Sequence, residues 1–359
     1  MRFPFLVVLL LLGTCGRAQL PLQISPDGTH LQDTEGNPFF YVGDTAWELL
    51  HRCDEREIRR YLQDRAAKGI NVIQCVALAE LDGLQTPNIK GDLPLHNLDP
   101  AQPNEAYFRH VDKAIRMADS LGIFIGLLPT WGDKFNLKWG VGPEVFTPTN
   151  AETFGRFLGE RYRDNNVIWI LGGDRNPEED EDYAIIRAMA EGLRTAIGDR
   201  QLITYHPQGG SRSSDFFPED DWLDFHMFQT GHGRLDDKAN YDFPRDVKKA
   251  SPGKPVINGE PAYEDHPVNW RAVNGWFDDF DSRQAAWWSV LAGTAGHTFG
   301  NHNIWQMYRP GREPISVART DWYEALHYPG VAQIGHLGRY ICQMLWLPKV
   351  CPAVPASTD

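Results

Sequence analysis

The chain has 359 residues, of which 42% are hydrophobic and 12% aromatic. This is enough for one large core, since a single α/β barrel commonly takes about 250 residues. The formal net charge is −13, and no segment is strongly basic. Nucleic-acid binding needs clustered Lys and Arg, so the charge argues against a nucleic-acid partner. It also gives no support to a long polyanionic ligand unless a local cationic pocket exists. The composition instead fits an enzyme for a small or neutral substrate.

The N-terminus has the pattern of a secretory signal peptide over residues 1–18. Arg2 supplies a positive charge, residues 3–12 form an apolar run, and Gly16-Arg17-Ala18 is a small-x-small cleavage site. The apolar run is too short to span a membrane, so we expect cleavage after Ala18 and a secreted or periplasmic protein. The alternative is a lipoprotein signal with Cys15 as the acylated residue, although the residue before it is a poor fit to that motif.

Turn signals and alternating patterns predict the elements that follow. Two turns, Asp27-Gly28 and Glu35-Gly36-Asn37-Pro38, separate short alternating runs and indicate a small β-hairpin. Farther along, Asp54 and Glu57 have the spacing of a capping box at a helix start, and Gly122 is a helix stop. The predicted strands are 39–42, 71–78, 123–128, 167–171, 201–205, 223–228, 255–258 and 295–299. The predicted helices are 54–68, 104–121, 150–162, 178–197, 241–250, 281–292 and 321–345, the last one broken near Pro329-Gly330.

This alternation of strands and helices predicts the fold class. Strands that alternate with helices form a parallel sheet, and eight such units form a (β/α)8 TIM barrel. No repeat, low-complexity tract or linker divides the chain, so we expect one catalytic barrel over residues 19–345. The segment 346–359 is interpreted as an atypical, truncated C-terminal tail.

Polar or aromatic side chains follow the predicted strands. In a TIM barrel these positions meet at one face, where the active site lies. One such residue is more often a helix cap or a partner in a loop salt bridge, but the repetition around the barrel favours a binding site. The residues concerned are Asp44, Glu80, Trp131 with Asp133, Asp174, His206, His226, Glu260, and His297 with Trp305.

Two of these carboxyl groups are candidates for glycosidic bond cleavage. That chemistry needs one carboxyl to protonate the leaving oxygen and another to attack the anomeric carbon or activate water. Asp174 and Glu260 follow the fourth and seventh strands, where many retaining glycosidases of this fold carry the pair, which is an argument by analogy. Asp44 or Glu80 could replace one member. Because a neighbouring cation lowers a carboxyl pKa, we expect the side chain of Arg175 to point away from Asp174.

Other chemistries find less support in the sequence. Histidines gather near the predicted mouth, yet no HExxH motif occurs and no cysteine spacing resembles a zinc site. The chain also lacks a Gly-x-Ser-x-Gly elbow and a P-loop. We therefore expect neither a metal nor a cofactor. The residues predicted to bind substrate hydroxyls or stack on a sugar are Asp44, Glu80, Trp131, Asp133, His206, His226, His297 and Trp305. The four cysteines beyond the leader offer one locally plausible bridge, Cys342–Cys351.

Several long motifs carry a resemblance to a known family. They are YVGDTAWELLHR, RAAKGINVIQCVALAELDGLQTPN, GLLPTWGDKF, VIWILGGDRNPE, NGEPAYEDHPV and GTAGHTFGNHNIWQ, in that order. Together they resemble the apiosidase-like family of bacterial exported glycosidases (glycoside hydrolase family 140). The resemblance implies a (β/α)8 barrel that acts on apiose-containing side chains of the plant pectin rhamnogalacturonan II. It also implies a retaining mechanism, with Asp174 as acid/base and Glu260 as nucleophile.

One departure from the family pattern concerns the C-terminus. Members of the family usually continue into a small β-sandwich domain, whereas the last residues here no longer resemble the family. The sequence alone leaves two alternatives: a glycosidase for another pentose or hexose, and a carbohydrate-binding barrel without catalytic activity.

Overall fold

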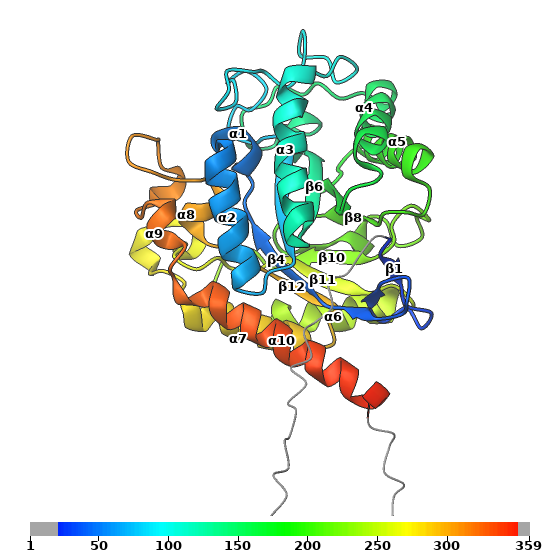
Figure 1. The fold of residues 1–359 in the computed structure, drawn as a ribbon, viewed down its shortest axis with the longest axis vertical. Coiled ribbons are helices and arrows are strands. Elements are labelled where there is room, and N and C mark those ends of the chain that lie inside the picture. The colour runs from blue at the N-terminus through cyan, green and yellow to red at the C-terminus, as the bar shows by residue number, and fades with distance from the viewer. Residues whose placement is uncertain (1–20, 351–359) are drawn as a thin grey trace, which may run out of the picture.

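The computed structural model describes residues 21–350 and shows a barrel surrounded by helices (Figure 1). The predicted signal peptide and residues 351–359 lie outside the described part. Within that part, nine strands form one sheet in the order β8-β7-β6-β5-β4-β12-β11-β10-β9. The short β9 is antiparallel to β10, and the other ladders are parallel. Between β8 and β10 the side-chain hydroxyl of Thr204 donates to the carbonyl of Phe225 at 2.7 Å, so the barrel is nearly closed. The predicted TIM barrel is confirmed.

The element bounds are close to those predicted. The barrel strands are β4 (Tyr41–Thr45), β5 (Val72–Leu78), β6 (Phe124–Thr130), β7 (Val167–Gly172), β8 (Ile203–His206), β9 (Ser211–Arg212), β10 (His226–Gln229), β11 (Val256–Glu260) and β12 (Gly296–Phe299). The helices are α1 (Leu49–Arg52), α2 (Glu55–Ala67), α3 (Glu105–Leu121), α4 (Pro148–Tyr162), α5 (Asp180–Ile197), α6 (Ala239–Ala250), α7 (Asp279–Leu291), α8 (His302–Trp305), α9 (Trp322–Ala325) and α10 (Pro329–Val350). The strand β4 runs on through Thr45, and β10 begins only at His226. These two shifts change which side chains reach the barrel mouth.

The ends of two helices confirm local signals in the sequence. At the start of α2 the side chain of Asp54 accepts hydrogen bonds from two backbone amides, and Glu57 accepts one from the Asp54 amide at 2.9 Å. This is the predicted capping box, which satisfies amides that have no partner within the helix. At the end of α3, Gly122 has a φ of 71°, in the left-handed region that glycine adopts without strain.

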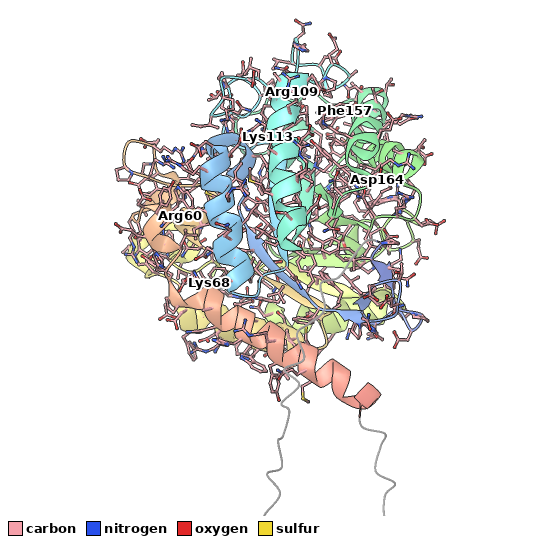
Figure 2. All side chains as sticks on the ribbon, in the orientation of Figure 1. Arg60, Lys68, Arg109, Lys113, Phe157 and Asp164 are labelled. Carbon is pink, nitrogen blue, oxygen red and sulfur yellow. The ribbon has the colours of Figure 1, made fainter. Side chains whose placement is uncertain are left out.

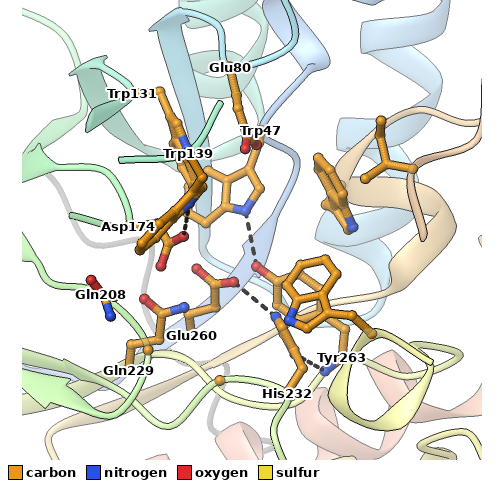
Figure 3. Close-up of a pocket in the computed structure, with 15 residues that line it drawn as sticks. Trp47, Glu80, Trp131, Trp139, Asp174, Gln208, Gln229, His232, Glu260 and Tyr263 are labelled. Atoms are coloured by element: carbon orange, nitrogen blue, oxygen red, sulfur yellow. Dashed lines mark hydrogen bonds and ion pairs between the residues drawn. The ribbon is translucent and has the colours of Figure 1, made fainter. Parts of the chain in front are cut away.

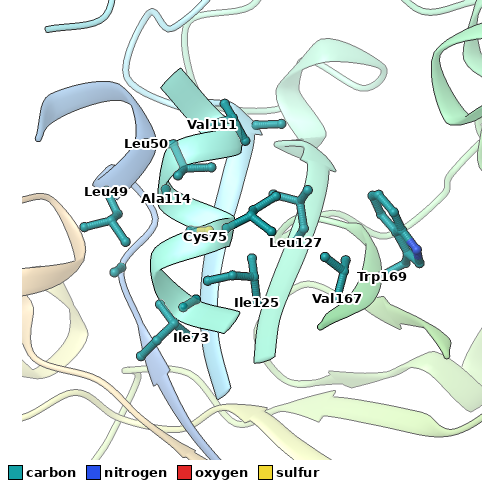
Figure 4. Packing of buried hydrophobic residues seen from close by; sticks show 14 of the residues in the cluster. Leu49, Leu50, Ile73, Cys75, Val111, Ala114, Ile125, Leu127, Val167 and Trp169 are labelled. Atoms are coloured by element: carbon teal, nitrogen blue, oxygen red, sulfur yellow. The ribbon is translucent and has the colours of Figure 1, made fainter. Parts of the chain in front are cut away.

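The core has two layers because successive strand residues point to opposite faces. One layer fills the barrel and includes Tyr41, Val72, Phe124 and Ile168. The other lies between the strands and the helices, as Figure 4 shows around α3. The residues of this outer layer include Ile73, Cys75, Ile125, Leu127 and Trp169 from the strands, and Val111 and Ala114 from α3.

The N-terminal end of the barrel is covered by a small sheet. In place of the predicted hairpin, β1 (Gln23–Ile24), β2 (Leu31–Gln32) and β3 (Pro38–Phe39) form an antiparallel sheet. The ring of Phe39 meets that of Phe124 edge to face, with centroids 5.3 Å apart, and Phe124 begins β6. This sheet therefore closes the end of the barrel opposite the carboxyl ends of the strands.

The outer surface carries charged side chains along the helices. Figure 2 labels Arg60 on α2 and Arg109 and Lys113 on α3, all of which are exposed. The last helix, α10, continues past the barrel boundary predicted at residue 345. Of the helices in residues 21–350, none is long and apolar enough to cross a membrane.

Candidate active site

A cavity of about 440 Å³ opens at the carboxyl ends of the barrel strands. Figure 3 shows it from close by, with Asp174 and Glu260 pointing into the same space. Its lining combines tryptophan rings with a few polar groups, the composition expected for a site that binds a sugar. The lining side chains and backbone positions are Trp47, Glu80, Trp131, Trp139, Asp174, Gln208, Gly209, Gln229, Gly231, His232, Glu260, Tyr263, Trp270, Trp305 and Ile315.

Asp174 reaches the cavity through a tight left-handed turn after β7. Gly172, Gly173 and Asp174 have φ values of 91°, 92° and 55°. A Cβ on Gly172 would come 2.4 Å from the carbonyl oxygen of His206, so the two backbone segments approach too closely for a larger residue. A positive φ at a non-glycine residue costs about 1–2 kcal/mol, and such strain is common at functional sites. The turn thus brings the short aspartate side chain to the cavity.

The Asp174 carboxyl forms hydrogen bonds with the side chains of Trp139 and Gln229 and has a raised pKa. The indole Nε1 of Trp139 donates to Oδ2 of Asp174 at 3.2 Å. Burial and the negative charge of Glu260 raise the pKa of Asp174 to about 6, against the opposing effect of His206 and Arg175. Such a group keeps its proton in weakly acidic solution, as a general acid must.

The side chain of Arg175 stays beside Asp174, against the expectation that it points away, although its hydrogen bonds go to backbone carbonyls and not to the carboxylate. Its guanidinium donates to the backbone carbonyls of Asn136, Trp139 and Asp174. The nearest approach to the carboxylate is 3.9 Å, from Nη1 to Oδ2 of Asp174, too long for a hydrogen bond. The cation nevertheless stays close enough to act on the carboxylate through space.

Glu260, the last residue of β11, is contacted by two imidazoles. Nε2 of His206 lies 3.0 Å from Oε2, and Nε2 of His232 lies 3.1 Å from Oε1. Each ring accepts a backbone amide at Nδ1: His206 from Asp174 at 3.2 Å, and His232 from Tyr263 at 3.3 Å. Because Nδ1 accepts a hydrogen bond in both rings, the ring hydrogen is on Nε2. Nε2 of His232 donates it to Oε1 of Glu260, whereas Nε2 of His206 lies close to Oε2 without hydrogen-bond geometry.

These contacts give the two carboxyls opposite properties. Burial alone would raise the pKa of Glu260, but the contacts with His206 and His232 outweigh it and hold the pKa well below its usual range. Glu260 is therefore an anion where Asp174 keeps its proton. Two carboxyls whose surroundings move their pKa values apart are the arrangement that acid/nucleophile pairs of glycosidases use.

Glu80 is a third carboxyl in the cavity. It follows β5, and Figure 3 shows its side chain directed into the cavity near Trp47. Burial and the negative charges of Asp174, Asp133 and Glu48 raise the pKa of Glu80 to about 8. The group is therefore mostly neutral at pH 7 and can both donate and accept a hydrogen bond.

The structure brings four of the eight predicted binding residues to the site and leaves the other four elsewhere. Glu80, Trp131 and Trp305 line the cavity, and His206 contacts Glu260. Asp133 is one of the other four and lies under the cavity: it is fully buried, and its Oδ2 accepts hydrogen bonds from the backbone amides of Val141 and Gly142 at 3.0 and 2.9 Å.

Asp133 therefore holds a loop and presents no oxygen to a substrate, which corrects the prediction for this residue. The sequence placed it at the mouth because it comes soon after β6. Its carboxylate is also bound by the ammonium of Lys134 at 2.7 Å, and both side chains are fully buried.

Asp44 is a second correction. Because β4 continues through Thr45, residue 44 belongs to the strand and points outward, toward α2. Its carboxylate is fully buried, pairs with Arg65 and accepts the Tyr61 hydroxyl at 2.7 Å. It ties strand to helix and does not reach the cavity.

His226 and His297 are also outside the cavity. His226 is the first residue of β10, at the end away from the mouth, and its Nδ1 lies 2.9 Å from Oγ of Ser213. His297 is the second residue of β12 and is buried in the sheet. Both histidines are therefore part of the packed barrel and do not reach a substrate.

Several cavity residues carry no sequence signal of their own. Trp139 lies on a loop without periodicity, and Trp270 lies on a loop well after the end of β11. His232 follows β10 closely and is one of the histidines that the sequence places near the mouth. Of the tryptophans that line the cavity, the sequence predicts Trp131 and Trp305. As for metals, among residues 21–350 no cluster of three or more His, Cys, Asp or Glu side chains could hold an ion. The buried Cys53 and Cys75 are thiols, and Cys351 of the suggested bridge lies outside the described range.

Comparison with known proteins agrees with this geometry. The model of the apiosidase-like catalytic domain matches residues 25–347. The chain belongs to the apiosidase-like family. Among curated proteins, the comparison found no match.

Solved structures place this apiosidase-like chain among the glycosidases. A glycoside hydrolase is 32% identical, with 90% of this chain and 74% of that chain covered and a TM-score of 0.81. A glycoside hydrolase family 5 protein from Bacteroides vulgatus is also 32% identical, with 89% and 71% covered and a TM-score of 0.80. A family 5 mannosidase from Rhizomucor miehei is 12% identical, with 93% and 100% covered and a TM-score of 0.64, and it shares the fold alone. The apiosidase-like chain is accordingly a glycoside hydrolase.

Proposed function

We propose that this chain is a retaining apiosidase that releases apiose from the side chains of rhamnogalacturonan II, a plant cell-wall pectin. The opposite states of the two cavity carboxyls carry the proposal: Asp174 keeps its proton, while His206 and His232 hold Glu260 as an anion. The family match supports the choice of apiose.

The proposed reaction has two steps. Glu260 attacks the anomeric carbon while Asp174 gives its proton to the leaving oxygen, so that one C–O bond forms as the other breaks. The Asp174 carboxylate then takes a proton from water, which attacks the same carbon and releases Glu260. Two inversions leave the configuration unchanged.

Charge in the cavity also supports an uncharged sugar as the group that enters. Among the described residues, the lining includes three carboxyls and neither Lys nor Arg. A uronate in this space would meet only negative or neutral groups, at a cost that grows as water is excluded. Apiose carries no charge, so it can occupy the cavity while the anionic pectin backbone stays at the mouth.

Neutral polar groups and rings are available for this sugar. Gln208 and Gln229 offer amides, and Glu80 offers a carboxyl that is mostly protonated at neutral pH. The rings of Trp131 and Trp305 offer apolar surface on which the face of the sugar formed by its C–H groups can stack.

The proposal includes export. The leader-like residues 1–18 support a secreted or periplasmic location, where pectin fragments are met. Expression with and without these residues, followed by fractionation, tests this part.

The first experiment measures apiose release from rhamnogalacturonan II side chains by the purified chain, beside Asp174→Asn and Glu260→Gln. We expect release by the wild type and a loss of about 10³-fold or more in each variant. NMR of the first-formed product should show retained configuration. Arabinosides and galactosides in the same assay test the alternative sugars. A folded wild type that releases no sugar, or variants as active as the wild type, would overturn the proposal.

A further inference from the structure

We infer that Trp139 is a positioning residue that decides which oxygen of Asp174 carries the transferable proton. The inference rests on the proposed role of Asp174 as the acid. It assigns the proton to Oδ1 and the carbonyl character to Oδ2, and it gives the loop after β6 a part in the reaction.

Two groups lie beside Oδ2 of the Asp174 carboxyl, and the side chain of Gln229 also forms a hydrogen bond with this carboxyl. The indole Nε1–H of Trp139 donates to Oδ2 at 3.2 Å, and Nη1 of Arg175 lies 3.9 Å from the same oxygen. In a carboxylic acid the carbonyl oxygen is a better acceptor than the hydroxyl oxygen. A donor and a cation beside Oδ2 therefore favour the form in which Oδ1 holds the proton.

The indole is held in place from beneath. The guanidinium carbon of Arg175 lies 3.8 Å from the centroid of the Trp139 ring, a cation–π contact. The same guanidinium donates to the backbone carbonyl of Trp139 and, at 2.9 Å, to that of Asn136. Arg175 is fully buried, so ring and backbone are fixed by one rigid group.

The loop is fixed on the other side of Trp139 as well. The buried carboxylate of Asp133 accepts the backbone amides of Val141 and Gly142. Gly140 has a φ of 100°, and a Cβ there would come 2.7 Å from Oδ2 of Asp133, so the loop passes directly over this carboxylate. Trp139 is thus positioned before any substrate arrives, which is how hydrogen-bond donors contribute most to catalysis.

The proton transfer shows what the indole does. As Oδ1–H gives its proton to the leaving oxygen, the carboxyl becomes a carboxylate and negative charge develops on both oxygens. The indole keeps its own hydrogen, but its bond to Oδ2 becomes charge-assisted and stronger. An interaction that is stronger in the transition state than in the ground state lowers the activation free energy. An interaction that is equally strong in both states does not.

The charged groups that face Asp174 come from several elements. They are Glu260 on β11, His206 on β8, the adjacent Arg175, and Glu80 after β5. Replacing Trp139 by Phe keeps an aromatic ring over Arg175 and leaves these charged side chains in the sequence, so the change in the titration of Asp174 in that variant reports chiefly the loss of the indole donor.

The first test needs no substrate. The indole ¹⁵N–¹H resonance of Trp139 is assigned by its loss in Trp139→Phe and is followed against pH. We expect it to shift as Asp174 ionises and the shift to disappear in Asp174→Asn. A resonance that stays constant, or that shifts equally in Asp174→Asn, would overturn the inference whatever sugar the enzyme cleaves.

The second test compares two leaving groups. Apiosyl fluoride needs little protonation, whereas a sugar-linked apioside needs the acid. Trp139→Phe should lose about 10- to 100-fold in kcat/KM on the sugar-linked substrate and about 2-fold or less on the fluoride. The alkaline limb of its pH profile of kcat/KM should move to higher pH. The variant lacks a donor to the ionised carboxyl, so the pKa of Asp174 rises.

Trp270→Phe is the matched control, since Trp270 also lines the cavity but donates to neither Asp174 nor Glu260 among the described contacts. Its loss should be the same on both substrates. Equal losses in Trp139→Phe would contradict the inference. Failure of the wild type on both apiosides would instead contradict the proposed substrate, and the resonance test would still decide the role of Trp139.

Discussion

His206 and His232 each contact one oxygen of the Glu260 carboxylate. Nε2 of His206 lies 3.0 Å from Oε2, and Nε2 of His232 lies 3.1 Å from Oε1. Each ring turns its Nδ1 to a backbone amide, and in His206 that amide belongs to Asp174. The backbone of Asp174 therefore also orients an imidazole that contacts the carboxylate of Glu260. A shift in one carboxyl residue is expected to disturb the other.

Removing His232 should raise the pKa of Glu260. In His232→Ala, Oε1 loses its donor, so the anion is less stable and the acidic limb of kcat/KM should move to higher pH. The charge-assisted contact suggests a loss of about 10- to 100-fold in kcat/KM. His232→Gln, whose amide can still donate, is the matched control and should retain more activity. The interpretation fails if both variants keep the wild-type acidic limb.

Gly172→Ala should damage both stability and activity. Its φ of 91° disfavours alanine, and its Cβ would meet the His206 carbonyl oxygen at 2.4 Å. We expect a loss of about 2–4 kcal/mol in the free energy of unfolding, together with a displaced Asp174.

Gly91→Ala separates the two causes. Gly91 has a φ of 87°, but nothing lies within 4 Å of its Cβ position. It should lose about 1 kcal/mol and keep full activity. Urea unfolding and kcat measure the two effects. Equal losses of stability in both variants would mean that the close approach of the backbone at Gly172 to that at His206 does not contribute to the effect of Gly172→Ala.

Asp44→Asn tests the reassignment of Asp44 as a structural residue. It removes the fully buried charge that faces the buried guanidinium of Arg65 and leaves only the partly exposed Asp64 as an ionic partner, so we expect a loss of about 3–5 kcal/mol in the free energy of unfolding. KM for the folded fraction should not change. Asp64→Asn is the control, because it removes another partner of Arg65 whose side chain is 18% exposed, whereas that of Asp44 is 0% exposed.

Asp64→Asn should cost about 1 kcal/mol or less. A raised KM in Asp44→Asn, with unchanged stability, would restore the substrate-binding role that the sequence suggested for Asp44.

Glu80→Gln should stabilise the protein at alkaline pH. The pKa of Glu80 is raised to about 8 in the folded chain, while in the unfolded chain a glutamate has a pKa of about 4.3. The unfolded state releases its proton first, so the wild type loses stability as pH rises between these values.

The variant does not titrate at this position and avoids that loss. Its melting temperature should exceed that of the wild type at pH 8, and the difference should vanish near pH 4. A difference that is constant across this range would show that the Glu80 proton is not linked to folding.

The sequence predicts that Asp174 and Glu260 face the cavity because both follow strong apolar runs, and the structure places both in its lining. Strands β7 and β11 contain few polar residues, and a glycine lies at or next to the end of each, so their ends are clear. The end of β4 and the start of β10 are not clear from the sequence. Asp44 and Thr45 continue β4 although they are polar, because Arg65 and Tyr61 on α2 neutralise the buried aspartate. No local pattern reveals a partner 21 residues away along the chain.

His226 shows the same difficulty at a strand start. Residues 223–228 form one apolar run, but only the second half pairs with β11. The position of Trp139 could not be predicted at all, because its loop is held by Asp133 and Arg175 through backbone groups, which every residue type has. Contacts of this kind are determined by the tertiary fold.

The last helix has a practical consequence. Where α2 ends, the carbonyl oxygen of Lys68 would lie only 1.7 Å from a Cβ on Gly335, so α10 packs backbone to backbone at the closed end of the barrel. The strand β1 also begins at the closed end of the barrel, and Figure 1 shows α10 running across this end. Both attachment points of the described domain are thus remote from the cavity. A bead, a scaffold or a partner enzyme joined at either point leaves the mouth facing the bulk polymer, so the domain suits immobilised and multi-enzyme formats.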